Sequence, residues 1–372
     1  MSPPSPSKVL MTADTVGGVW TFAVELCAGL AKYGVEVTLL SMGGLPDESQ
    51  LADAMKLPNL RLVSTAHRLE WMRDCEKDVI ESGRLLLQLA HEWRPDVVHV
   101  NGYYHAALPF EAPIVLTAHS CVASWWRACR GEVLPIEWRR YMQWVSAGVS
   151  RADLVTAPTQ AFLDQFQAMH GRARAARAIW NGRNASLFSP GVKRNMVLAA
   201  GRLWDEAKNI PLLCRVAGQL NVPVAVAGGD VSPDGTTAEL ANVVWLGRLS
   251  PADIAAQMAQ ASVFAAPARY EPFGLSILEA ALSGCALALA DIPTLRELWD
   301  SAAVFISPDD DEGWLCALSQ LTENPDLAYE YGTRARERAA RYSAEQMTAH
   351  YLDAYPAVST ARATHQIVEA AA

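Results

Sequence analysis

Short apolar runs alternate with stretches of helical periodicity along the chain. The N-terminal segment has an apolar run at 9–12, a glycine pair at 17–18 and a stretch at 20–33 whose apolar residues recur at helical spacing. A second apolar run follows at 35–41. Because strand, helix and strand in this order form a right-handed crossover, the pattern predicts two parallel strands with a glycine loop after the first.

The alternation continues to the C-terminal tail, interrupted by one polar segment with Gly and Pro at 180–191. Further strands are predicted at 97–100, 114–117, 154–157, 196–200, 222–227, 243–246, 263–266, 286–290 and 303–306, with helices beginning near residues 209, 252, 275, 295 and 312. The tail from 325 to about 358 is helical by composition, with a break at 342–343. The fold class is α/β, with a doubly wound first domain at 1–188, joined by a helix at about 345–372, and a second at 189–344.

The composition is that of a folded protein. Of 372 residues, 51% are apolar and 19% are charged, which supplies large cores and excludes wholesale disorder. The net charge of −9 argues against nucleic acid as a partner. Seven cysteines without a Cys-x-x-Cys pair fit reduced thiols better than disulfides or a zinc site. Residues 1–7 are interpreted as a disordered leader, and no apolar run is long enough to span a membrane, so we expect a cytoplasmic protein.

Basic residues concentrate in one block. Residues 119–194 hold eleven Arg and Lys against four Asp and Glu. Within the block, Trp138, Tyr141 and Trp144 stand at helical spacing, which favours packing inside the protein over a lipid-facing surface. The alternative is a weak peripheral contact of block 119–194 with the inner face of an anionic membrane, or with an acidic lipid-linked acceptor.

The clearest chemical signal is the segment 269–280, which follows a predicted strand and begins a predicted helix. Pro272 and Gly274 fix a turn there. The free amides of Gly274, Leu275 and Ser276 are therefore expected at a helix N-terminus, whose positive dipole end favours an anion such as a diphosphate.

Four charged residues accompany this turn. Glu271 precedes it, and Glu279 lies about one helical turn inside, where a carboxylate can accept hydrogen bonds from hydroxyl groups. A solvated carboxylate is the alternative for a single Glu. Arg202 and Lys208 follow the predicted strand 196–200 and are expected at the same sheet edge. Two cations and a helix N-terminus would hold a diphosphate without a metal, each charge-assisted hydrogen bond contributing about 1.5–3 kcal/mol.

The second domain resembles that of retaining glycosyltransferases of family 4, which have the GT-B fold. Their Glu-x7-Glu motif matches Glu271 to Glu279, their Gly-Arg-Leu…Lys-Asn motif matches 201–209, and their Asn-Gly…Phe-x-Pro segment resembles 181–190. The resemblance implies two Rossmann-like parallel-sheet domains that face an interdomain cleft. It also implies that Glu279 binds ribose hydroxyls, that Glu271 and the turn Phe273, Gly274 and Leu275 contact the donor sugar, and that Arg202 and Lys208 hold the diphosphate.

Two features of the first domain also match the family. Gly17 and Gly18 resemble its glycine loop, whose backbone approaches the donor phosphate or the acceptor. His119, directly after the predicted strand 114–117, matches the cleft histidine that contacts the donor sugar; outside this context it would be typical of a structural histidine. Acceptor contacts are expected from the loops 67–73 and 101–104. The other histidines show no metal spacing, so no metal or other cofactor is expected.

The chain departs from the family pattern in two places. The spacing from Arg202 to Lys208 is one residue longer than usual, and 291–297 lacks the glycine pair that commonly precedes a Glu. These departures predict an altered pairing of the two cations and a reshaped edge for the acceptor or donor sugar.

The predicted reaction moves a hexose from a nucleoside-diphosphate sugar, UDP-glucose favoured, to a hydroxyl of a glycan, glycolipid or small molecule. The resemblance favours front-face substitution over double displacement. His119 and Glu271 would then orient the sugar while the cations stabilise the leaving diphosphate. Two alternatives are a nucleotide-sugar epimerase or hydrolase of the same fold, and a non-catalytic nucleotide-sugar-binding relative.

Overall fold

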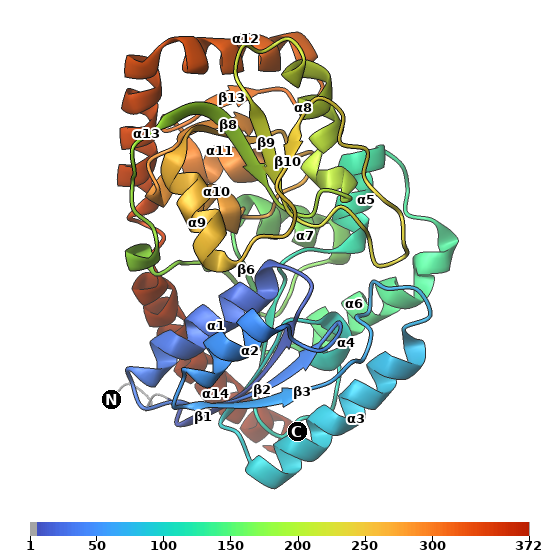
Figure 1. Ribbon diagram of the computed structural model, residues 1–372. Coiled ribbons are helices and arrows are strands. Elements are labelled where there is room, and N and C mark those ends of the chain that lie inside the picture. The colour runs from blue at the N-terminus through green and yellow to red at the C-terminus, as the bar shows by residue number, and fades with distance from the viewer. Residues whose placement is uncertain (1–5, 372) are drawn as a thin grey trace. The chain divides into compact units, whose positions relative to one another are not determined.

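The computed structural model describes residues 6–371, with side chains described as far as residue 358. The chain divides into two compact units (Figure 1). Unit 1 comprises the chain up to Ser124, residues 133–180 and the chain from Ala344 onward, and unit 2 comprises 125–132 and 181–343. Residues 1–5 of the predicted leader and residue 372 of the predicted last helix lie outside the described residues.

Unit 1 is a parallel sheet with strand order β3-β2-β1-β4-β5-β6-β7. Its strands are β1 (Lys8–Asp14), β2 (Glu36–Met42), β3 (Leu60–Ser64), β4 (Val97–Val100), β5 (Ile114–Thr117), β6 (Leu154–Ala157) and β7 (Ala176–Ala178). Its helices are α1 (Gly18–Ala31), α2 (Glu48–Met55), α3 (Glu76–Trp93), α4 (Tyr103–Ala106), α6 (Arg139–Arg151), α7 (Gln160–His170) and α14 (Ala344–Ala371), with a 3₁₀ turn at Ile136–Trp138. The predictions missed β3 and β7 because these edge strands are only partly buried and lack a continuous apolar run.

Unit 2 repeats this architecture with strand order β10-β9-β8-β11-β12-β13, again all parallel. Its strands are β8 (Arg194–Ala200), β9 (Val224–Ala227), β10 (Val244–Trp245), β11 (Ala261–Ala266), β12 (Ala286–Ala290) and β13 (Val304–Ile306). Its helices are α8 (Ile210–Ala217), α9 (Pro251–Gln260), α10 (Leu275–Leu282), α11 (Pro293–Trp299), α12 (Asp311–Glu323) and α13 (Pro325–Ala339), with 3₁₀ turns at Ala185–Leu187 and Glu206–Lys208. All six strands predicted in this half are present.

Two features of the division differ from the sequence-based one. Residues 181–188 pack with unit 2 rather than with the first domain, because Phe188 is buried in the core of unit 2. The boundary also falls inside α5 (Val122–Arg130), so that residues 125–132 belong to unit 2. The helix predicted beyond residue 345 is α14, and it packs against α1 where a Cβ on Gly29 would overlap Thr348 (Figure 1).

Candidate functional site

Each sheet has one point where the connections from neighbouring strands diverge. In unit 1 this point lies between β1 and β4, and in unit 2 it lies between β8 and β11. Open α/β sheets bind ligands outside the carboxyl ends of the strands at this point. In unit 2 the loops that follow β8 and β11 contain 201–209 and 267–274, so both predicted motifs fall at the topological position suited to a ligand.

The loop after β8 depends on two glycines in close contact. Gly201 has φ of +157°, and its amide donates to the carbonyl of Ala227 at 3.0 Å. Gly228 has φ of +142°, and a Cβ there would lie 1.8 Å from the carbonyl oxygen of Gly201. Any side chain at 228 would therefore displace the start of the loop that carries Arg202 and Lys208.

The end of this loop is fixed by Asn209. Its backbone is left-handed with φ of +53°, and it caps α8. Its buried side-chain amide donates to the carbonyls of Pro267 at 3.0 Å and Pro308 at 2.8 Å. The amide of Arg269 in turn donates to Ala207 at 2.9 Å. These bonds tie the loop after β8 to the loop after β11, so the Asn of the predicted motif has a structural role.

The two predicted cations have different partners. Lys208 forms an ion pair with Glu271, and both side chains are largely buried. Arg202 donates from Nη2 to Oδ2 of Asp205 at 2.7 Å, and 40% of the Arg202 side chain is exposed. The structure thus brings together two predicted residues 63 positions apart, and it leaves the side chain of Arg202, in the same loop as Lys208, partly exposed.

The turn before α10 supplies the predicted helix N-terminus. Gly274 caps the helix with φ of +85°, and a Cβ there would overlap the side chain of Ile277. The carbonyl of Gly274 accepts from the amides of Ile277 and Leu278 at 3.0 and 3.1 Å. Ser276 donates from Oγ to the carbonyl of Ala200 at 3.4 Å, which places the first turn of α10 beside the end of β8. The positive end of this helix therefore lies at the same edge as the cations.

The side chains around this turn divide into buried and polar groups. Phe273 is buried, and its ring packs edge-on against Tyr342 with centroids 5.9 Å apart. Leu275 is half-buried against the core. Thr294, at the start of α11, donates to the backbone carbonyl of Glu271 at 2.6 Å. Phe273 and Leu275 therefore hold the turn in place through apolar packing, while the polar groups of the turn are those of its backbone.

Glu279 has a partner that the sequence-based predictions missed. Arg183 Nε lies 2.8 Å from Glu279 Oε1, and both side chains are largely buried. The guanidinium also lies over the ring of Phe188 at 5.2 Å, and the Arg183 amide donates to Tyr342 at 3.1 Å. Arg183 directly follows the Asn-Gly pair of the segment 181–190, so its position in that motif is the one sequence signal that could have identified it.

In unit 1, His119 is held in a defined tautomer. Asn101 donates from Nδ2 to the carbonyl of Thr12 at 2.5 Å, so its Oδ1 faces His119 Nε2 at 2.8 Å. Because Oδ1 can only accept, Nε2 carries the proton and Nδ1 is the acceptor nitrogen. Burial lowers the pKa of His119 to about 3, which keeps the ring neutral at pH 7. Asn101 belongs to the loop 101–104, which was predicted to contact an acceptor, but its hydrogen bond to His119 was not predicted.

The glycine pair of unit 1 lies where it was predicted, between β1 and α1. Gly17 is the N-cap of α1 in an extended conformation. The carboxylate of Asp14 accepts from the amides of Val16 and Gly17 at 3.0 and 3.1 Å. Gly18 begins the helix. The amides of this loop are thus partly satisfied by the chain's own carboxylate.

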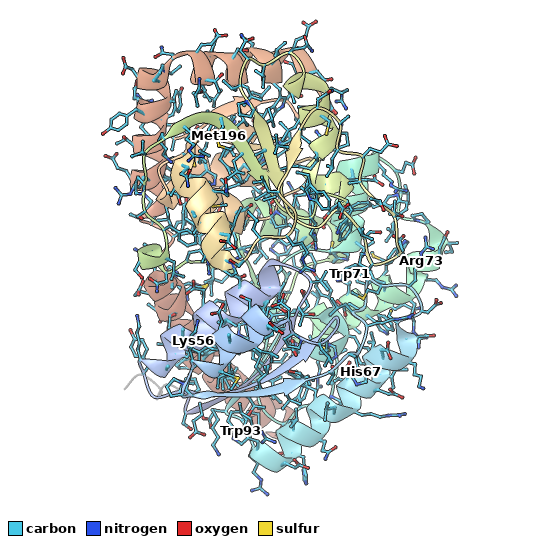
Figure 2. All side chains as sticks on the ribbon, in the orientation of Figure 1. Lys56, His67, Trp71, Arg73, Trp93 and Met196 are labelled. Atoms are coloured by element: carbon cyan, nitrogen blue, oxygen red, sulfur yellow. The ribbon has the colours of Figure 1, made fainter. Side chains whose placement is uncertain are left out.

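The two loops predicted to contact an acceptor meet in unit 1. Glu70 accepts from the amides of Tyr103 and Tyr104 at 3.0 and 2.9 Å, and burial raises its pKa to about 7. His67, Trp71 and Arg73, labelled in Figure 2, belong to the same loop between β3 and α3. His67 also lies near Asp78 and Glu81, with one ligand atom of each within 4.8 Å of the others, a grouping that the sequence spacing did not indicate.

Two aromatic residues of the basic block pack inside the protein, as predicted. Tyr141 and Trp144 are buried in α6. Tyr141 packs edge-on against Tyr103, and Trp144 packs against Tyr104. Among the residues that the structure describes, no helix combines the length and apolar character needed to cross a membrane.

Models of two glycosyltransferase families match this chain. The model of Glycosyltransferase Family 4 matches residues 16–187, and that of Glycosyl transferases group 1 matches residues 194–324, so that the two matches span most of the chain. Taken together, the two matches show that the chain is a glycosyltransferase of the family 4 and group 1 type. The predicted family resemblance is therefore confirmed.

Curated relatives of this glycosyltransferase include two mycobacterial enzymes. A glycogen synthase of Mycobacterium tuberculosis is 24% identical, covering 87% of this chain and 86% of that protein. A phosphatidyl-myo-inositol mannosyltransferase of Mycolicibacterium smegmatis is 27% identical, covering 96% and 95%. One relative is named a glycogen synthase and the other a mannosyltransferase of phosphatidyl-myo-inositol, so the two support the same class of reaction but do not indicate one substrate.

Solved structures confirm the GT-B fold. Sucrose-phosphate synthase of Thermosynechococcus elongatus superposes with a TM-score of 0.78 at 18% identity, covering 95% of this chain and all of that one. HepE of Anabaena, solved in complex with UDP-glucose, superposes with a TM-score of 0.72 at 16% identity, covering 93% and 98%. At these identities the likeness establishes the architecture of two Rossmann-like domains.

Proposed function

We propose that this glycosyltransferase transfers a hexose with retention from a nucleoside-diphosphate sugar, UDP-glucose or a similar donor, to a hydroxyl acceptor. Glycan, glycolipid and small-molecule acceptors fit this class, which includes the enzymes of polysaccharide biosynthesis. HepE, a structural neighbour, was solved with UDP-glucose, which supports a uridine donor here. No metal or other cofactor is part of the proposal, because the protein's own cations are placed to carry the charge of the diphosphate.

The observation that carries the proposal is the convergence of positive groups at one edge of the unit 2 sheet. Lys208 contacts Glu271, Arg202 stands in the same loop, and Ser276 ties the α10 N-terminus to the end of β8. We assign Arg202, Lys208 and the first amides of α10 to the diphosphate. When the diphosphate binds, Lys208 can turn toward it and leave Glu271 to accept hydrogen bonds from sugar hydroxyls.

The proposed chemistry is a front-face substitution. The bond between the anomeric carbon and the phosphate oxygen breaks, the acceptor oxygen bonds to the same face of that carbon, and the acceptor proton passes to the departing phosphate oxygen. Preorganised cations are effective here because negative charge develops on the diphosphate as it leaves. His119, neutral and with Nδ1 as acceptor, would receive a hydrogen bond from a sugar hydroxyl and orient the donor.

A binding and turnover experiment tests the proposal. Thermal stabilisation by UDP, GDP and ADP is measured first, and the sugar forms of the stabilising nucleotide are then incubated with and without a pool of hydroxyl acceptors. We expect the nucleotide to be released only when an acceptor is present. We also expect NMR to show that the new glycosidic bond has the anomeric configuration of the donor. Acceptor-independent product would favour an epimerase or hydrolase, and binding without turnover would indicate a non-catalytic relative.

A further inference from the structure

A tryptophan far away in the sequence reaches the loop that carries the proposed diphosphate site. Trp125, in α5, donates from its indole N–H to Oδ1 of Asp205 at 2.9 Å. Both residues belong to unit 2. Neither was singled out by sequence motifs, and 80 positions separate them.

Asp205 connects this tryptophan to Arg202. One carboxylate oxygen accepts from Trp125 and from the amide of Ala207 at 3.0 Å, while the other accepts from Arg202 at 2.7 Å. Only 4% of the Asp205 side chain is exposed. Burial by itself would raise the pKa of Asp205. The charge of Arg202 and the hydrogen bond from Trp125 lower it by a larger amount, so the pKa lies below its ordinary value. The carboxylate is therefore charged and oriented at neutral pH.

The end of α5 is anchored to the same loop by a second contact. Arg130 donates from Nη2 to Glu206 Oε1 at 2.6 Å and from Nε to Oε2 at 3.3 Å. Its guanidinium also lies over the ring of Trp126 at 4.4 Å. Two adjacent residues of the loop, Asp205 and Glu206, are thus held by α5. These contacts keep the Trp125 indole facing Asp205.

We propose that Trp125 and Asp205 are positioning residues that hold Arg202 ready for the diphosphate. This inference rests on the proposed nucleotide-sugar site and adds to it the parts that orient its exposed cation. Arg202 has a long, 40% exposed side chain, which would otherwise lose rotamer freedom when it binds. Asp205 fixes one side of the guanidinium in the free enzyme, and Trp125 fixes Asp205, so that less of this freedom is lost on binding.

The test replaces the indole while keeping an aromatic ring. Binding of UDP and of uridine to wild type and Trp125→Phe is measured by calorimetry, with GDP or ADP and the matching nucleoside used instead if one of those stabilises the wild type. We expect UDP binding to weaken about 2- to 10-fold, the scale of one hydrogen bond or one ordered side chain, while uridine binding is unchanged. Equal weakening of both ligands would show general damage to the site and overturn the positioning role.

A matched control lies next to Trp125 in the same helix. The indole nitrogen of Trp126 is buried, and among the described residues it has no hydrogen-bond partner. Trp126→Phe removes this indole N–H but keeps an aromatic ring beneath the Arg130 guanidinium, so it should leave both affinities unchanged. A loss of UDP affinity equal to that of Trp125→Phe would assign the effect to α5 packing and contradict the inference.

A double-mutant cycle separates the inference from the proposed function. In an Arg202→Ala background, Trp125→Phe should cause no further loss of UDP affinity, because the residue through which it acts is gone. Additive losses would overturn the inference while leaving the proposed function intact. A wild-type protein that binds none of UDP, GDP and ADP would instead reject the proposed function, and the inference with it.

Discussion

The two units share one architecture but bury different groups. In unit 1, some buried polar residues lie on helices, such as Ser82 and His105, but others lie on the strands themselves, among them Thr12 on β1, His99 on β4 and Thr117 on β5. In the described part of unit 2, buried polar residues such as Asp205 and Asn209 lie in loops and helices, and strands such as β12 are apolar throughout. The same doubly wound topology thus accommodates strands with buried polar side chains in one unit and strands without them in the described part of the other.

Buried polar side chains on the strands of unit 1 bind its last helix, α14. His99 pairs through Nδ1 with the hydroxyl of Tyr355 at 2.9 Å and through Nε2 with Thr117 at 2.7 Å. Thr117 also pairs with Tyr351 at 3.1 Å, and Tyr351 and Tyr355 both belong to α14. Unit 2 instead places largely buried charges in two ion pairs. Lys208–Glu271 joins the loops after β8 and β11, and Arg183–Glu279 joins the segment before β8 to α10. Unit 1 thus uses buried polar side chains to hold a helix that is distant in the sequence, whereas the largely buried ion pairs of unit 2 lie around the edge proposed to bind the donor.

The largest expected effect concerns the ion pairs of unit 2. Lys208→Met should lower kcat/KM about 100- to 1000-fold, the usual cost of removing one preorganised group that stabilises charge in the transition state. Steady-state kinetics with the nucleotide sugar measures it. Arg215→Met is the control, because Arg215 pairs with Asp311 at 2.6 Å on the exposed surface of the same unit. Equal activity of the two variants would remove Lys208 from the site.

A somewhat smaller effect is expected at Glu279. Glu279→Gln removes the charge that faces Arg183 and that is proposed to bind ribose hydroxyls, so nucleotide affinity should fall about 10- to 100-fold, the range for a lost charged hydrogen bond. Calorimetry with UDP measures the loss. Glu330→Gln, which breaks an exposed pair with Arg334, should change nothing. Unchanged affinity in Glu279→Gln would contradict the ribose role.

Acid should distinguish the units. All eight histidines belong to unit 1, and burial lowers the pKa of His99 and His119 to about 3 and that of His105 and His170 to about 4. Between these values and the ordinary 6.5, the unfolded chain binds protons that the folded unit does not, so the stability of unit 1 is complete above about pH 6.5 and decreases as pH falls. At pH 5.5 the expected loss is about 1 kcal/mol per fully buried histidine.

Hydrogen exchange at pH 7.5 and 5.5, corrected for intrinsic rates, measures this difference. Protection of β4 and β5 should decrease at pH 5.5, while that of β11 and β12 should stay unchanged because unit 2 has no histidine. Glu70 opposes the trend, since its raised pKa of about 7 favours the folded state at lower pH, but one carboxyl offsets only part of four histidines. Parallel loss of protection in both units would reject the assignment to buried histidines.

The smallest expected effect concerns the orientation of His119. Asn101→Ala removes the acceptor that fixes the Nε2 proton, so the imidazole can adopt either tautomer and kcat should fall about 3- to 10-fold, the scale of one hydrogen bond. The Nε2 proton and its partner can be followed by ¹⁵N NMR of the histidine ring. A variant with normal kcat and an unchanged tautomer would show that Asn101 does not position His119.

The sequence by itself determined the architecture and the motif residues of this protein. Alternating apolar runs and helical periodicity predicted the strands of both units except β3 and β7. The central strands of a parallel sheet are buried on both faces, so they are apolar along their length and can be recognised in the sequence. The segments 201–209 and 269–280 could be recognised because their chemistry is encoded locally, in a turn and a helix N-terminus.

The tertiary structure decided which of these residues meet. The pairs Lys208–Glu271, Arg183–Glu279 and Trp125–Asp205 join positions 63, 96 and 80 apart. A contact of this kind depends on the order of strands in a sheet and on where a loop turns back, and no local propensity records either. The sequence thus identified Arg202, Lys208, Glu271 and Glu279. Their unpredicted partners Arg183 and Asp205 became evident only in the fold, because they depend on how distant segments pack.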